Sequence, residues 1–287
     1  MSSISDQSAN ESSTPIDLGD VQETLLIPLY YRAMESVADR PAFVDQKAIE
    51  ILPRLNYDFS GFDQAWSLRN DVVTRTVIFD ELVADFIKRH PDGRVINLGA
   101  GLDARFWRLD NGQIRWYDLD MPDSIALREP FLCTGERNHV IAKSMFDRSW
   151  FDDISEVDDD ETATLIVAEA LFIYFDEALI RDLFDDLTRR FPGAEILFQS
   201  ICPAIVGRKS VVPILRRTRA ELKWGIHTGR ELESWDCRPK FLGEWSLVDR
   251  LPARWRYYRW VKRLPMIGRH LREVMKISRM RLAGPPA

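Results

Sequence analysis

Residues 94–104 read Arg-Val-Ile-Asn-Leu-Gly-Ala-Gly-Leu-Asp-Ala. The first half of this stretch is a short apolar run of the kind that forms a buried parallel strand. The second half is rich in glycine, which weakens a strand interior and marks a turn. Glycine at 99 and 101 permits a positive φ angle and lets a ligand approach the backbone closely. We therefore expect a nucleotide or nucleoside to bind over Gly99, Ala100 and Gly101.

Strand-like and helix-like patterns alternate around this glycine turn. Predicted strands cover residues 94–98, 114–120, 139–142, 164–168, 195–199, 241–247 and 274–282. Predicted helices cover residues 45–51, 69–90, 122–137 and 176–190, the last capped by Asp176. Alternation of this kind favours an α/β fold with a mostly parallel, seven-stranded sheet and helices on both faces.

The chain divides into three predicted regions. Residues 1–20 are rich in Ser, Asn, Asp and Glu and predict a disordered tail without the features of a signal peptide. Residues 21–92 predict an N-terminal helical extension that acts as a lid. Residues 93–287 predict the nucleoside-binding domain, and residues 203–238 within it, where the alternation breaks, predict an inserted helical cap.

Charge and cysteine content limit the classes of function. The formal net charge of −6 over 287 residues does not favour nucleic acid as a partner. Three widely spaced cysteines without a C-x-x-C pair predict reduced thiols, a cytoplasmic protein and no metal site. No apolar run reaches the roughly 20 residues that span a bilayer. Residues 250–282 are strongly basic, which fits either a solvated face or a surface that binds phosphate or membrane.

Acidic residues near the glycine turn help to identify the expected ligand. Asp120 ends the second predicted strand, where a carboxylate accepts hydrogen bonds from both hydroxyls of a ribose, although it could also cap the helix that starts at Pro122. Asp103 lies inside the turn, where its charge would repel the pyrophosphate of a dinucleotide but not a cationic sulfonium. We therefore favour S-adenosylmethionine over NAD(P) as the cofactor.

Spaced motifs along the chain resemble those of a known family. They are Arg75-Thr76 with Phe79-Asp80, residues 95–106 around the glycine turn, Trp116-Tyr117-Asp118-Leu119-Asp120-Met121-Pro122, and Glu169-Ala170-Leu171-Phe172-Ile173-Tyr174-Phe175. Together they resemble the leucine carboxyl methyltransferase family, and within it the bacterial polyketide O-methyltransferase branch. The resemblance runs from about residue 25 to residue 247. It implies a class I, Rossmann-like methyltransferase that acts in secondary metabolism.

The resemblance also implies roles for residues that match the family motifs. Arg75 would meet the methionyl carboxylate of S-adenosylmethionine, and Asp120 the ribose. Glu169, at the end of the fourth predicted strand, either binds the amino group of the cofactor or pairs with an arginine. The remaining predicted cofactor contacts are Gly99, Ala100, Gly101, Leu119, Ser144 and Met145. Because Ser144 departs from the acid common in the family, Asp147 or the backbone could recognise the adenine instead.

The acceptor side is less sharply defined by the sequence. Tyr174 matches an aromatic position of the family, and His227 is the histidine best placed to act as a base, so these two are the predicted catalytic residues. Tyr30, Tyr31, Arg32 and Trp224 are the predicted substrate contacts, although the same residues could simply form a hydrophobic seal. A carboxylate acceptor would need no general base, whereas a phenol would benefit from one.

The sequence thus predicts an S-adenosylmethionine-dependent O-methyltransferase of a small, polyketide-like aromatic molecule. Two alternatives stay open at this point. One is an NAD(P)-dependent oxidoreductase that uses the same glycine turn. The other is a non-enzymatic binding protein that docks through its basic C-terminal region.

Overall fold

The computed structural model describes residues 20–62, 66–154, 162–208, 221–251, 253–255 and 272–284, with side chains from residue 25 onward. Its α-helices are α1 (Asp20–Ser36), α2 (Gln46–Ile51), α3 (Trp66–Arg89), α4 (Arg105–Leu109), α5 (Pro122–Arg128) and α6 (Glu177–Arg190). Its strands are β1 (Arg94–Leu98), β2 (Arg115–Asp120), β3 (Asn138–Ala142), β4 (Thr164–Ala168), β5 (Glu195–Ile201), β6 (Lys240–Ser246) and β7 (Met275–Arg281).

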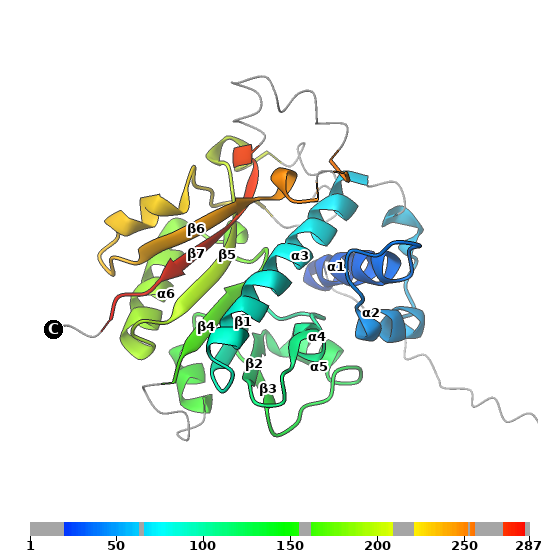
Figure 1. Ribbon diagram of the computed structural model, residues 1–287, viewed down its shortest axis with the longest axis horizontal. Coiled ribbons are helices and arrows are strands. Elements are labelled where there is room, and N and C mark those ends of the chain that lie inside the picture. The colour runs from blue at the N-terminus through cyan, green and yellow to red at the C-terminus, as the bar shows by residue number, and fades with distance from the viewer. Residues whose placement is uncertain are drawn as a thin grey trace, which may run out of the picture.

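The described strands form one seven-stranded sheet in the order β3-β2-β1-β4-β5-β7-β6 (Figure 1). The first five of these strands run parallel, and β7 is antiparallel to both β5 and β6. The predicted mostly parallel sheet is therefore confirmed. Strand order reverses between β1 and β4, so the carboxyl ends of these two strands border the crevice where open α/β sheets bind ligands.

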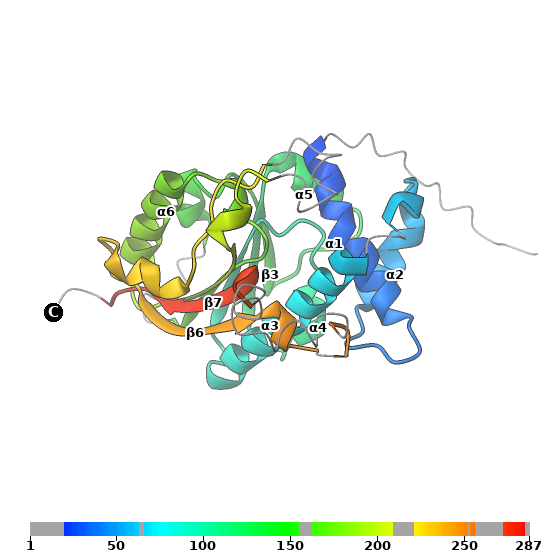
Figure 2. The ribbon, with the colours of Figure 1, turned by 90° about the horizontal axis from the view of Figure 1, so that it is seen from above.

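Helices cover both faces of the sheet, with α3 on one side and α6 on the other (Figure 2). Alternate residues of each strand face opposite helices, because side chains alternate across a pleated sheet. Val95 packs in the core cluster that contains Phe79 and Val83 of α3. Ile96 packs in the cluster that contains Leu183 and Phe184 of α6. Central strands buried on both faces explain the continuous apolar runs in the sequence.

Two predicted helical features differ from the structure. The helix predicted over 122–137 ends at Arg128, because Pro130 has no backbone N–H to continue the helical hydrogen bonds. Asp176 holds the N-cap position of α6, but its side chain makes no capping hydrogen bond. It instead lies 3.4 Å from Nζ of Lys223.

The N-terminal extension packs as a small helical unit beside the sheet. Helices α1 and α2 lie side by side at the end of the molecule away from α6 (Figures 1 and 2). Their apolar side chains form a core cluster with Phe62 of the adjoining 3₁₀-helix Phe59–Phe62 and with Leu102, which follows the glycine turn. The extension therefore shares a core with the loop that the sequence predicts to bind the cofactor.

The segment 203–238 contains two short 3₁₀-helices in its described parts, Pro203–Ile205 and Gly229–Ser234. Residues 209–220 of the predicted cap, residues 1–19 of the predicted tail and residues 256–271 of the basic region lie outside the described residues. Within the described residues, no helix is both long and apolar enough to cross a membrane.

Candidate functional site

The glycine turn lies between β1 and α4 with Gly99 and Gly101 at φ angles of +64° and +46°. Its position is fixed by backbone N–H groups of Gly99 and Ala100, which donate to the carbonyl oxygen of Leu119 at 2.8 and 3.1 Å. A Cβ atom at residue 99 would lie 2.8 Å from Cδ1 of Leu171, and one at residue 101 would lie 2.9 Å from Cδ2 of Leu25. Both positions therefore favour glycine for conformation, whereas the close contacts come from the movable ends of two leucine side chains.

The far side of the turn is held by Arg128 of α5. Its Nη1 donates to the carbonyl oxygens of Gly101 and Asp103 at 2.8 and 2.7 Å, and its Nη2 pairs with Asp118. Asn97 donates to the same Asp118 carboxylate at 2.9 Å. Because the Arg128 guanidinium is fully buried, the turn rests on a rigid polar support. Arg128 lies outside the sequence motifs described above, and only its position in space reveals its role.

Asp120 lies at the end of β2, beside the glycine turn. Its Oδ2 accepts from the backbone N–H of Gly101 at 2.7 Å and its Oδ1 from that of Met121 at 2.7 Å. Burial raises the pKa of the Asp120 carboxyl, against the opposing effect of these two N–H groups. Helix α5 begins after Met121 without a side-chain cap, so the capping alternative does not hold. The Ser124 side chain also hydrogen-bonds to this carboxylate, so three of its about four lone pairs are used and one is left for a ligand hydroxyl.

Arg75 of α3 lies across the turn from Asp120 and joins two carboxylates. Its Nε donates to Glu169 at 2.8 Å and its Nη1 to Asp71 at 3.0 Å. Its Nη2 makes no hydrogen bond with the described residues, which leaves one donor for a ligand carboxylate. Although burial by itself lowers the pKa of the Arg75 guanidinium, Asp71 and Glu169 raise it above its usual value.

Glu169 pairs with arginines, which is one of the two alternatives that the sequence predicts for this residue. Its second oxygen accepts from Nη2 of Arg105 at 2.6 Å. Arg105 also donates to Asp80 at 2.7 Å and to Asp103, so a single guanidinium links α3, the glycine turn and the end of β4. We call the connected ion pairs around Arg105 the buried ion network. Its members are Arg32, Asp45, Asp71, Arg75, Asp80, Asp103, Arg105, Arg108 and Glu169.

The network places Asp103 in different electrostatic surroundings from those that the sequence suggested. Burial by itself raises the pKa of this carboxyl, but the guanidiniums of Arg105 and Arg108 hold it well below its usual range. The charge of Asp103 is thus compensated within the turn, and it does not act as the isolated anion that the sequence argument against a pyrophosphate assumed. Asp103 therefore does not by itself exclude a pyrophosphate, contrary to the expectation from the sequence, and the cofactor follows from other observations.

The predicted adenine contacts Ser144 and Met145 lie shortly after β3. The Ser144 hydroxyl accepts from the backbone N–H of Phe146 at 3.3 Å, and the carbonyl of buried Met145 accepts from Trp150 at 3.1 Å. Asp147 accepts from the backbone N–H of Ser149, which lowers the pKa of its carboxyl. Its side chain therefore caps the 3₁₀-helix Arg148–Asp153.

The two predicted catalytic residues have different surroundings. Tyr174 is half-buried in the 3₁₀-helix Phe172–Tyr174, and its hydroxyl makes no hydrogen bond with the described residues. Burial raises the pKa of Tyr174, although the nearby Arg75 guanidinium opposes this shift. The His227 side chain is 64% exposed, and its Nδ1 lies 3.9 Å from Glu273. Within the described residues no contact links His227 to the buried ion network.

The four predicted substrate contacts pack inside the protein. Tyr30 stacks on Phe59, and the Tyr31 hydroxyl donates to the carbonyl of Phe62 at 2.7 Å. Arg32 pairs with Asp45 and donates to the carbonyl of Leu102 at 2.7 Å. Trp224 is 2% exposed in the core beneath α6. This packing fits the alternative in which these residues form a hydrophobic seal, and a substrate contact by them stays a prediction.

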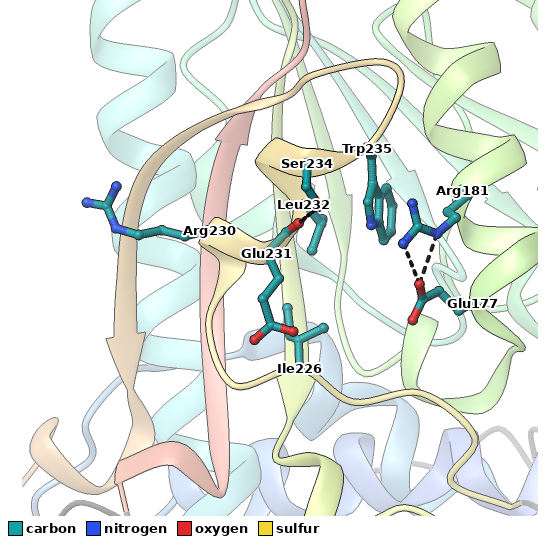
Figure 3. A pocket seen from close by; sticks show the side chains of 8 residues that line it. All are labelled: Glu177, Arg181, Ile226, Arg230, Glu231, Leu232, Ser234 and Trp235. Carbon is teal, nitrogen blue, oxygen red and sulfur yellow. Dashed lines mark hydrogen bonds and ion pairs between the residues drawn. The ribbon is translucent and has the colours of Figure 1, made fainter.

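A surface pocket of about 290 Å³ lies between α6 and the 3₁₀-helix Gly229–Ser234 (Figure 3). It contains none of the predicted site residues. Its charges are already matched, because Arg181 pairs with Glu177 and stacks over Trp235, while Glu231 completes a capping box with Thr228. We therefore place the functional site at the glycine turn and the buried ion network, and not in this pocket.

Comparisons with known proteins show a family and relatives of similar sequence. Residues 26–188, more than half of the chain, match the family described as leucine carboxyl methyltransferase. The tetracenomycin polyketide synthesis O-methyltransferase TcmP of Streptomyces glaucescens is 33% identical over 82% of this chain and 86% of its own. The S-adenosyl-L-methionine-dependent methyltransferase dpfgK of Gibberella zeae is 28% identical over 78% of this chain and 83% of its own.

Solved structures share the fold. A candidate methyltransferase from Thermobifida fusca YX has a TM-score of 0.58 at 12% identity and covers 96% of this chain and 97% of its own. A DUF574 family protein from Streptomyces avermitilis has a TM-score of 0.60 at 12% identity, and the match covers 93% of this chain and 100% of its own. The matches in sequence leave the dinucleotide oxidoreductase without support. The protein is an S-adenosylmethionine-dependent methyltransferase, and the chain belongs to the leucine carboxyl methyltransferase family.

Proposed function

We propose that the protein transfers a methyl group from S-adenosylmethionine to an oxygen of a small, polyketide-like aromatic acceptor. The observation that carries the proposal is the placement of Asp120 and Arg75 on opposite sides of the glycine turn, each with hydrogen-bonding capacity left over. The relative from Streptomyces glaucescens is named for polyketide synthesis, which supports a polyketide as the class of acceptor.

The residues around the turn fit the parts of this cofactor. Asp120 would accept from a ribose hydroxyl, Nη2 of Arg75 would meet the methionyl carboxylate, and the backbone near Ser144 and Met145 would border the adenine. When bound, S-adenosylmethionine supplies an electrophilic methyl group on a cationic sulfur. The chain itself mainly orients the two reactants and excludes water, which suits a displacement in which charge is lost.

Within the acceptor oxygens, we favour a carboxylate over a phenol. A carboxylate is ionised at neutral pH and needs no base, whereas a phenol with a pKa near 10 benefits from one. Tyr174, the half-buried candidate, has a raised pKa and therefore keeps its proton at neutral pH. Its hydroxyl is suited to donate a hydrogen bond to the acceptor, and the exposed His227 makes no contact with the network that would position it as a base.

Calorimetry with S-adenosylhomocysteine and with NADH tests the cofactor. We expect binding of the first and none of the second, and loss of that binding in Asp120→Ala and Gly99→Val. Asp123→Ala is a matched control, because Asp123 is an exposed acid three residues beyond Asp120. A preference for NADH, or equal losses in Asp120→Ala and Asp123→Ala, would contradict the proposed site.

A screen with isotope-labelled S-adenosylmethionine then tests the acceptor. It would include aromatic carboxylic acids, phenols and short peptides with a free C-terminal carboxylate. We expect labelled methyl esters of the aromatic acids. Labelled phenyl ethers alone would overturn the carboxylate assignment but not the methyl transfer, and labelled peptides alone would overturn the small-molecule acceptor.

A further inference from the structure

A second cluster of reactive side chains lies at the same edge of the sheet, at the ends of β5 and β7, the next two strands after β4. It consists of Cys202 after β5, His227 in the inserted segment and Glu273 before β7. Their ligand atoms, one sulfur, one imidazole nitrogen and one carboxylate oxygen, all lie within 4.8 Å of one another. Among the described residues, this is the one group of three such side chains that could hold a metal ion. The methyl-transfer site uses none of them.

Backbone hydrogen bonds bring the three residues together. The N–H of Ile226 donates to the carbonyl of Ile201 at 2.9 Å, and the N–H of Cys202 donates to the carbonyl of Val274 at 3.0 Å. Each member of the cluster is thus within one residue of a bonded backbone pair. A Cβ atom at Gly225 would lie 2.7 Å from the carbonyl oxygen of Ile201, so glycine there permits the close approach. The three residues are therefore held close together by backbone hydrogen bonds at the ends of β5 and β7.

The three groups are the ligand types that Zn²⁺ and similar borderline-soft cations prefer. Bond lengths of about 2.0–2.3 Å to Zn²⁺ correspond to separations of about 3.3–3.8 Å between tetrahedral ligand atoms. Nδ1 of His227 is 3.9 Å from Oε2 of Glu273, already close to that range. Cys202 is 1% exposed, whereas the His227 side chain is 64% exposed, so the open side of the cluster faces solvent.

Neighbouring charge does not oppose a cation strongly. Lys276 lies near the cluster, where its Nζ donates to the carbonyl of His227. The same Nζ lies 3.5 Å from Oε1 of Glu244, which compensates its charge. Glu273 has two carboxylate oxygens, so one can bind a metal while the other serves another partner.

We propose that Cys202, His227 and Glu273 form a binding site for Zn²⁺ with three protein ligands and a fourth position open to water. On binding, the Cys202 thiol releases its proton to solvent and a sulfur–zinc bond forms, without any change of oxidation state. The metal would fasten the inserted segment to the ends of β5 and β7. This site is independent of the methyl transfer proposed above.

Titration of the chelator-treated full chain with Zn²⁺, monitored by calorimetry, tests the proposal, with Mg²⁺ as the control ion. We expect one Zn²⁺ per chain, no binding of Mg²⁺, and an affinity lower by about 100-fold in Cys202→Ser. His227→Gln should weaken binding as well, and because His227 is exposed this variant should fold even if Cys202→Ser does not. Cys237→Ser should bind Zn²⁺ as the wild type does. The Cys237 thiol hydrogen-bonds to Asp185 of α6 and is not part of the cluster.

Cobalt gives a second, spectroscopic readout. Co²⁺ bound to a thiolate produces sulfur-to-metal charge-transfer absorption, which we expect in the wild type and in Cys237→Ser but not in Cys202→Ser. The proposal would be overturned by the absence of stoichiometric Zn²⁺ binding, by equal affinity in His227→Gln and the wild type, or by charge-transfer absorption that depends on Cys237 and not on Cys202.

Discussion

At the scale of single residues, Arg75 has the surroundings of a ligand-binding group. Two of its guanidinium nitrogens are held by Asp71 and Glu169, which fix the plane of the group before any ligand arrives. A planar guanidinium oriented in this way matches a carboxylate, and the lysine ammonium does not reproduce that geometry. Arg75 therefore combines a structural role with the capacity to recognise the amino-acid end of the cofactor.

Substitution Arg75→Lys should lower the affinity for S-adenosylhomocysteine by about 10- to 100-fold, the value of one or two charge-assisted hydrogen bonds. Affinity for 5′-methylthioadenosine, which lacks the methionyl carboxylate, should stay within a factor of about 3. Calorimetry with both ligands measures the difference. Equal losses for the two ligands would show that Arg75 acts only through the fold.

At the scale of elements, the buried ion network ties together helices that are distant in the sequence. Arg105 of α4 contacts Asp80 of α3 and Glu169 after β4, and Arg108 of α4 contacts Asp45, the N-cap residue of α2. Buried ion pairs contribute little net stability when complete, but removal of one partner leaves charges without compensation. The network thus makes the relative positions of these elements specific.

Substitution Arg105→Met should destabilise the protein by about 3–5 kcal/mol, because three carboxylates lose a common partner in a buried site. Chemical denaturation followed by circular dichroism measures the change. Arg148→Met is the matched control, since Arg148 is an exposed partner of Asp186 and should cost less than about 1 kcal/mol. Similar losses in the two variants would contradict the importance of the network.

The turn after β4 is a second feature at this scale. Ala170 has a φ angle of +50°, a conformation that costs a residue with a Cβ atom about 1–2 kcal/mol. This backbone conformation positions the residues on either side of Ala170. Glu169 pairs with two arginines, and Leu171 packs over Gly99. The turn aims both side chains at the predicted cofactor site.

Substitution Ala170→Gly should be nearly neutral, because the relief of strain offsets the greater entropy of the unfolded chain. Ala170→Val should destabilise the protein by at least about 1–2 kcal/mol, since a β-branched residue tolerates positive φ poorly, and should weaken S-adenosylhomocysteine binding. Thermal melts and calorimetry would be compared for the two variants. An Ala170→Val variant as stable as Ala170→Gly would count against strain at this turn.

At the scale of the whole molecule, the N-terminal extension and the sheet enclose the glycine turn from two sides. Leu25 of α1 approaches Gly101, and Arg32 of α1 donates to the carbonyl of Leu102. A cofactor bound over the turn would therefore border α1. We propose on these contacts that the extension acts as a lid, which would couple ligand binding to the order of the extension.

Hydrogen–deuterium exchange should detect this coupling. Binding of S-adenosylhomocysteine should slow exchange of the backbone amides in residues 25–36 as well as in residues 94–120. Amides of α6, on the opposite face from α3, provide the internal control and should change little. Protection confined to residues 94–120 would argue against a lid formed by α1.

The sequence by itself determined the local features. Apolar runs fixed the strands, glycines with positive φ fixed the turn after β1, and the spaced motifs identified the family, because all of these depend on neighbours along the chain. Helix α5 was the main local exception, since Pro130 ends it early.

Only the tertiary structure decided which charges meet. The sequence placed Asp103, Arg105 and Glu169 near the site, but it could not show that one guanidinium joins them or that Arg128 supports the turn. It also predicted no metal site, and spacing rules cannot bring together residues such as Cys202, His227 and Glu273, which come from three distant segments and form the proposed site. Ion pairs and ligand clusters depend on distances through space, and those follow from the packing of strands and helices rather than from adjacency in the chain.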